Sequence, residues 1–327
     1  MRSAILLTAL LGFSLHAADA APQAYALIVS GEGGESHFSE NYKDWTIRLH
    51  KLLVERGIPA ANIRVLMETK DAAPVCNDSA TRENIIKAFD EYAKSVKAAD
   101  QFSLFFIGHG TAQNKLGKLC LPGADISSDD VANALGRIPA KAQLFVNSAA
   151  LSDSYLEKCS APGRVIITAT NNPGEGNETY FMEFFLRGCE SKAADGNKDG
   201  AITVLEAFNH AATECPKWYL RQYLDKTSAW RVEGKQAREL WQKFYGKVAE
   251  KKMAPAADNA DDAEPKLGEW GPHWEGRRMP TEHAQLDDNG DKIGTAVFVN
   301  NDYLLVTPGD ENSDGFHAQK FVLGAKK

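Results

Sequence analysis

The sequence predicts an α/β protein in which helices cover both faces of a mostly parallel central sheet. Two observations lead to this fold class. Short apolar runs alternate along the chain with longer amphipathic segments, which is the order of strand and helix in α/β proteins. The apolar runs are also continuous and lack a period of two, as expected of strands buried on both faces. With 327 residues and 43% hydrophobic content, the chain can bury one large core and a smaller unit.

The predicted strands are apolar runs that end in glycine or polar residues. In order, they are Ala24 to Val29, Asn62 to Met67, Phe102 to Ile107, Gln143 to Asn147 and Arg164 to Thr170. Three helices are expected between them: Glu40 to Arg56, a helix capped by Thr81 that runs to about Lys97, and Asp129 to Arg137. Gly57 ends the first of these helices, since glycine readily adopts the left-handed conformation found beyond a helix end.

The second half of the chain reads differently. From Thr179 onward it is mostly helical, and the clearest helices are Val204 to Glu214 and Lys235 to Lys251. Residues Ala254 to Pro265 are rich in Ala, Asp and Pro, which indicates a linker. Short strands are expected at Thr295 to Asn300 and at Tyr303 to Val306. These patterns divide the chain into a leader (1–20), the α/β domain (21–190), a helical segment (191–251), and a linker with C-terminal extension (252–327).

The first twenty residues resemble a bacterial secretory signal peptide. Arg2 precedes an apolar run from Ala4 to Leu15, and Ala18-Asp19-Ala20 forms a small-residue cleavage site. A secreted or periplasmic location is therefore expected. No later stretch reaches the roughly 20 apolar residues that span a membrane. The formal net charge of -7 argues against nucleic acid as a partner, and the oligomeric state stays open.

An odd number of cysteines leaves at least one thiol unpaired in an oxidising compartment. Two pairings are geometrically plausible, Cys76 with Cys120 and Cys189 with Cys215. The sequence does not decide between these pairs and free thiols. The absence of a C-x-x-C motif argues against zinc and redox chemistry.

The strand Phe102 to Ile107 is followed directly by Gly108-His109-Gly110, and the next strand ends at Asn147-Ser148-Ala149. In parallel sheets, ligands bind beyond the carboxyl ends of the strands, so both segments are expected at one functional edge. A histidine there can act as a general base, and a glycine beside it lets its backbone amide approach a reacting carbonyl. His109 and Gly110 are therefore the candidate catalytic residues.

Four segments in order resemble the legumain-like (C13) peptidases of the caspase-like superfamily, and the resemblance spans about residues 24 to 190. They are Ala24 to Gly31, Gly57 to Leu66, Phe105 to Gly110 and Ile166 to Asn171. The resemblance implies a caspase-like three-layer sandwich with a helical and irregular C-terminal extension. It also implies a catalytic cysteine after the fourth strand, and that position is occupied by Ala149.

Alanine cannot supply a nucleophile, and losing the nucleophile of a triad-type enzyme costs on the order of a millionfold in turnover. A serine could substitute only under restrictive geometry. Ser148 is adjacent to Ala149 and is expected to face the other way, whereas Ser152 and Ser154 are in the following turn. The pocket residues differ as well: residues 31–44 contain no arginine, and Asn147 stands where the family has an acidic pocket residue. Asparagine specificity is therefore not expected.

A second motif predicts calcium binding. Residues 195–206 match the twelve-residue EF-hand loop, with a glycine, Gly200, at the sharp turn. The expected Ca²⁺ ligands and ligand positions are Asp195, Asn197, Asp199, Ala201, Thr203 and Glu206. Two further segments, which begin at Asp287 and Asp310, repeat the first half of the pattern without the closing glutamate, which favours polar turns.

These patterns lead to one main hypothesis and two alternatives. The main hypothesis is an exported, calcium-stabilised pseudopeptidase that binds an extended peptide or protein segment. The first alternative is an active peptidase that uses His109 with a nucleophile other than cysteine. The second is a structural protein of the cell envelope.

Overall fold

The computed structural model describes residues 21–171, 175, 178–227, 282–299, 302–303 and 305–324. The expected leader, the helix expected at Lys235 to Lys251 and the linker at Ala254 to Pro265 lie outside these residues.

The core is an eight-stranded sheet with the order β11-β10-β9-β8-β4-β1-β2-β3. Its strands are β1 (Ala24–Ser30), β2 (Ile63–Met67), β3 (Asp78–Ser79), β4 (Gln101–Ile107), β8 (Ala142–Asn147), β9 (Arg164–Thr168), β10 (Gln285–Asp287) and β11 (Thr295–Ala296). All neighbours from β9 to β3 pair in parallel, whereas β10 pairs antiparallel with both β9 and β11. The prediction of an α/β fold with a mostly parallel sheet is confirmed.

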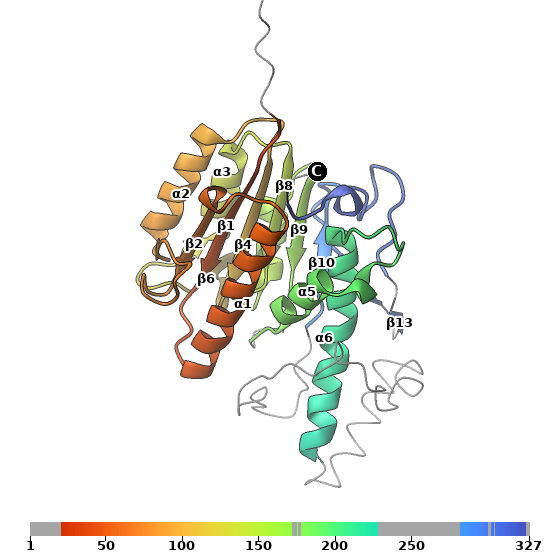
Figure 1. Ribbon diagram of the computed structural model, residues 1–327. Coiled ribbons are helices and arrows are strands. Elements are labelled where there is room, and N and C mark those ends of the chain that lie inside the picture. Colours follow the sequence, from red (N-terminus) through yellow and green to blue (C-terminus); the bar gives the residue numbers. More distant parts are fainter. Residues whose placement is uncertain are drawn as a thin grey trace, which may run out of the picture.

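Helices cover both faces of this sheet and make three layers (Figure 1). One face carries α1 (Ser36–Glu55), α5 (Phe181–Glu190) and α6 (Val204–Thr227). The other carries α2 (Arg82–Ser95), α3 (Ser128–Arg137) and the short α4 (Leu156–Cys159). Each face has its own cluster of buried apolar side chains, because every central strand contributes alternate residues to each side. We call these clusters the α1-side core and the α2-side core.

The helix starts follow the local sequence. Thr81 caps α2 as predicted, since its hydroxyl accepts a hydrogen bond from the Asn84 amide at 3.2 Å. Ser127 and Asp130 form a reciprocal capping box at the start of α3. The helix α6 continues to Thr227, well beyond the predicted end at Glu214.

Two small sheets are additional. One contains β5 (Gly110–Gln113), β6 (Leu116–Leu119) and β7 (Ile126–Ser127), and the other contains β12 (Phe298–Val299) and β13 (Asp302–Tyr303). Short 3-10 turns complete the order: η1 (Ala60–Asn62), η2 (Ser152–Tyr155), η3 (Lys192–Ala194) and η5 (Ala318–Lys320). The antiparallel sheet from β5 to β7 begins directly after His109, so its pairing fixes the backbone that follows the histidine.

The C-terminal residues share the core of the α/β domain. Leu286, Val306 and Leu323 all belong to the α1-side core, together with residues of α1 and α5. All five cysteines are free thiols, so neither plausible disulfide is formed. Cys189 and Cys215 are both buried in the α1-side core, where burial raises the pKa of the Cys189 thiol to about 12. Among the described helices, none combines the length and apolar character needed to cross a membrane.

Candidate functional site

Three neighbouring strands, β8, β4 and β1, end at the same edge of the sheet, where α1 begins (Figure 1). Gly31 follows β1, His109 follows β4 and Ser148 follows β8. The predicted meeting of these segments at one edge is therefore observed. We call this region the carboxyl edge.

Both ring nitrogens of His109 have partners. Nε2 lies 3.1 Å from the Gly33 carbonyl oxygen, and Nδ1 lies 3.3 Å from the Tyr42 hydroxyl. Because a carbonyl only accepts, Nε2 carries the proton and Nδ1 accepts from Tyr42. Burial lowers the pKa of His109, which favours this neutral form. The ring also meets Phe38 edge to face, with centroids 4.9 Å apart. The imidazole is thus held against α1 and the loop after β1.

Ala149 lies in a different environment. Its side chain is buried in the α2-side core, which also contains Leu119 and Tyr155, whereas Phe38 and Tyr42 belong to the α1-side core. The ring of His109 therefore contacts side chains of the α1-side core, whereas the methyl group of Ala149 packs in the α2-side core. Asn147 is fully buried, and its Oδ1 accepts from the Ala149 amide at 3.1 Å.

The nearby serines are bonded to other groups. Ser148 donates to the Phe106 carbonyl at 2.7 Å, and Ser154 donates to the Leu151 carbonyl at 2.5 Å. The Ser152 hydroxyl lies 3.1 Å from the Thr170 hydroxyl and accepts from the Thr170 amide. Each hydroxyl stabilises a strand end or turn, and none is bonded to His109.

Cys120 also lies at the carboxyl edge, because its amide donates to the His109 carbonyl at 3.0 Å. It is half-buried, and burial, followed by the charges of Asp125 and Glu32, raises the pKa of its thiol. A reactive cysteine needs a lowered pKa, so these surroundings disfavour the thiolate.

Gly110 is required by packing. A Cβ at this position would overlap the Ala150 carbonyl oxygen and lie 3.2 Å from the Ala149 Cβ. Leu151, which follows Ala150 in the turn after β8, adopts a left-handed conformation with φ of 52°, which is uncommon for a residue with a side chain. The turn after β8 is therefore pressed against the start of β5, and Gly110 makes room for it.

A cavity of about 250 Å³ opens at the ends of β1 and β2, beside the first turns of α1. Tyr42, Met67 and Glu68 are among the residues that line it. The sequence patterns did not single out this cavity or the partners of His109. Phe38 and Tyr42 are spaced four residues apart on an amphipathic helix, which indicates only a buried helix face.

The predicted calcium loop connects α5 and α6. Gly200 has a φ of 85°, the conformation that the sixth position of the motif requires. The Asp195 carboxylate accepts from the amides of Asp199 at 3.2 Å and Gly200 at 2.9 Å. Glu206, the twelfth residue, reaches back to the Gly196 amide at 3.1 Å. The carboxylates of the first and twelfth residues, Asp195 and Glu206, thus both accept from backbone amides of the loop. All the expected ligand atoms are oxygens, which Ca²⁺ prefers.

Within the described ranges, no three His, Cys, Asp or Glu side chains are arranged to hold a metal ion. In the present conformation, the carboxylates of Asp195 and Glu206 instead satisfy backbone amides. The two half-patterns near the C-terminus behave alike. Asp287 accepts from the Gly290 amide and Asp310 from the Asn312 amide, each at 3.0 Å. Asp288, between the pattern positions, accepts from the amides of Gly315 and Ala318 at 3.0 and 2.7 Å and so joins the two turns to each other.

No family model matches this chain, and no curated protein matches it either. Among solved structures, the crystal structure of protein GSU0716 from Geobacter sulfurreducens is similar. It is 15% identical in sequence, with a TM-score of 0.40 over 58% of this chain and 88% of that chain. This likeness assigns no function.

Proposed function

We propose that this protein is an exported pseudopeptidase of the caspase-like superfamily, similar to the legumain-like enzymes, that binds an extended peptide segment without cleaving it. One observation carries the proposal. His109 is at the position of a catalytic base, yet Gly33 and Tyr42 engage its two nitrogens. No nitrogen is left to take a proton from a nucleophile, and Ala149 offers none.

Binding at the carboxyl edge is supported by its location and shape. Ligands of open α/β sheets bind beyond the carboxyl ends of the strands, and a cavity opens there. The alternative of an active enzyme with a serine nucleophile needs a hydroxyl bonded to the imidazole. The hydroxyls of Ser148, Ser152 and Ser154 are instead committed to backbone and threonine partners.

Hydrogen exchange in the presence of a library of extended peptides tests the binding. We expect slower exchange of the amides of residues 31–43 and 109–120, which border the carboxyl edge. Residues 97–100 lie at the opposite end of β4 and serve as the internal control. Protection spread evenly over both regions, or no protection by any peptide, would contradict the proposal.

The second part of the proposal is a Ca²⁺ ion in the loop 195–206, where Asp195, Asn197, Asp199 and Glu206 provide side-chain oxygens and Ala201 its carbonyl. The ion stabilises the connection between α5 and α6 by neutralising the carboxylates gathered there. Arg56 holds the same connection, because its guanidinium donates to the carbonyls of Ile202, at 3.3 Å, and Cys189. The role of calcium is therefore structural.

Thermal unfolding with Ca²⁺ or a chelator tests this site. Ca²⁺ at a hundred times its dissociation constant stabilises the folded state by about 2.7 kcal/mol, which raises the midpoint by roughly 5 °C or more. The rise should vanish in Glu206→Gln. It should persist in Asp310→Asn, which alters a half-pattern without the closing glutamate. Equal midpoints with Ca²⁺ and chelator in the wild type would refute the site.

A further inference from the structure

The cavity at the ends of β1 and β2 has room for one side chain. Its volume is about 250 Å³, below the roughly 300 to 1,000 Å³ of pockets that hold drug-sized ligands. It lies beneath the first turns of α1. The lining residues are Ser30, Gly31, Ser39, Glu40, Tyr42, Lys43, Met67, Glu68, Thr69 and Ala72.

The walls combine apolar surface with a fixed carboxylate. Tyr42, Met67 and Ala72 contribute apolar surface. The half-buried Glu68 is held by two donors, since its Oε2 accepts from the Ser39 hydroxyl at 3.2 Å and from the Gly33 amide at 3.4 Å. No cation among the described residues forms an ion pair with Glu68, and its Oε1 has no hydrogen-bond donor there. A half-buried carboxylate of this kind gains from a cationic partner.

Gly33 joins this cavity to the candidate site. Its amide donates to Glu68, while its carbonyl accepts from His109. Gly33 thus links the Glu68 carboxylate in the cavity directly to the imidazole of His109. The surrounding loops add negative charge, because Glu32 and Glu35 act electrostatically on His109.

We infer that the cavity binds the side chain of a lysine or arginine in the peptide, with the aliphatic stem against Tyr42, Met67 and Ala72 and the cationic head at Glu68. As a statement of peptide specificity, the inference rests on the proposed function. An acidic side chain is disfavoured because Glu40 and Glu68 both line the cavity. Lys43 lines it too, but its exposed side chain is not paired with Glu68 and leaves that carboxylate available.

The test uses single-residue probes that do not depend on peptide binding. The Nα-acetyl N-methylamides of lysine, norleucine, asparagine and glutamate are titrated into the full chain, and the amide resonances of Gly33 and Thr69 are followed by NMR. We expect lysine to bind at least about tenfold more tightly than norleucine, which has a similar stem and no charge. Equal binding of the two, or a preference for asparagine or glutamate, would overturn the inference.

Three variants locate the probe. Glu68→Gln should abolish the lysine preference, whereas Glu157→Gln, an exposed glutamate on α4, should retain it. Ala72→Leu fills the cavity and should weaken every probe at least tenfold. Lysine binding that survives both Glu68→Gln and Ala72→Leu would place the site elsewhere and refute the inference. Lysine binding by the cavity without binding of any longer peptide would refute only the proposed function.

Discussion

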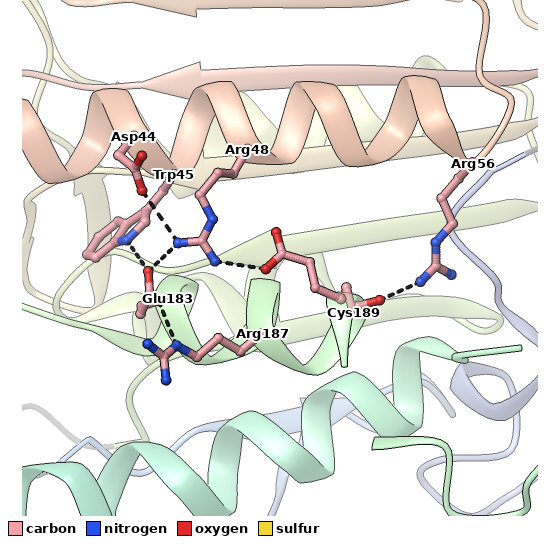
Figure 2. A network of polar contacts seen from close by, with 8 residues as sticks. Asp44, Trp45, Arg48, Arg56, Glu183, Arg187 and Cys189 are labelled. Atoms are coloured by element: carbon pink, nitrogen blue, oxygen red, sulfur yellow. Dashed lines mark hydrogen bonds and ion pairs between the residues drawn. The ribbon is translucent and has the colours of Figure 1, made fainter. Parts of the chain in front are cut away.

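Replacing Glu183 with alanine is expected to lower the free energy of unfolding by about 3 to 5 kcal/mol, because it breaks a buried ionic network between α1 and α5 (Figure 2). The carboxylate of Glu183 accepts from Trp45 Nε1 at 2.8 Å, from Arg48 at 2.6 Å and from Arg187 at 2.8 Å. Its side chain is only 6% exposed. Alanine would leave a buried indole donor and two partly buried guanidinium groups without this partner.

Urea unfolding measures the effect as a lower midpoint at an unchanged slope. Asp44→Ala is the matched control, since Asp44 contacts the same Arg48 at 3.4 Å from an exposed position. An exposed pair one helical turn apart contributes little, so this variant should lose less than about 0.5 kcal/mol. Similar losses in the two variants would show that burial of Glu183 does not determine its contribution.

Raising the pH from 5 to 8 is expected to destabilise the protein by a few kcal/mol through Glu282. Burial raises the pKa of this carboxyl from 4.5 to about 8, although Tyr219 and the amides of Tyr180 and Phe181 donate to it. Between pH 4.5 and 8 the folded state thus binds more protons than the unfolded state, so stability falls as pH rises. Asp314, whose pKa burial raises to about 6, acts in the same direction.

The pH dependence is measured as the free energy of unfolding at a series of pH values for the wild type and Glu282→Gln. Glutamine resembles the protonated carboxyl and does not titrate. We expect the stability of Glu282→Gln relative to wild type to improve steadily from pH 5 to pH 8. Glu157→Gln, at an exposed position, should show no such trend. A difference between Glu282→Gln and wild type that is independent of pH would contradict the raised pKa.

The strands and helices of the α/β core were predictable because each is long enough to display its pattern. The runs at Phe102 to Ile107 and Gln143 to Asn147 correspond to β4 and β8 nearly residue for residue. By contrast, β10 contains only Gln285–Asp287, too few residues to show a period. Its place beside β9 depends on contacts with residues more than a hundred positions away, which local patterns do not report.

The site was predictable to a similar extent. Since β4 ends at the carboxyl edge, the position of His109 followed from the order of the strands. The direction of the His109 ring could not be predicted in this way, because it depends on hydrogen bonds to Tyr42 and Gly33. The cavity carboxylate Glu68 was also missed: a glutamate just after a strand is usually solvated, and only packing of Ser39 and Gly33 against it shows otherwise. Local sequence therefore located the site, and tertiary contacts determined its chemistry.

Peptide hydrolysis tests the central claim most directly. The wild type, His109→Ala, Cys120→Ala and Ala149→Cys are compared on one library of extended peptides, with turnover followed by mass spectrometry. We predict no turnover by the wild type, His109→Ala or Cys120→Ala, while the wild type still binds peptides. Ala149→Cys should also stay inactive, because Tyr42 and Gly33 engage both ring nitrogens of His109. Turnover by the wild type that disappears in His109→Ala would contradict the account.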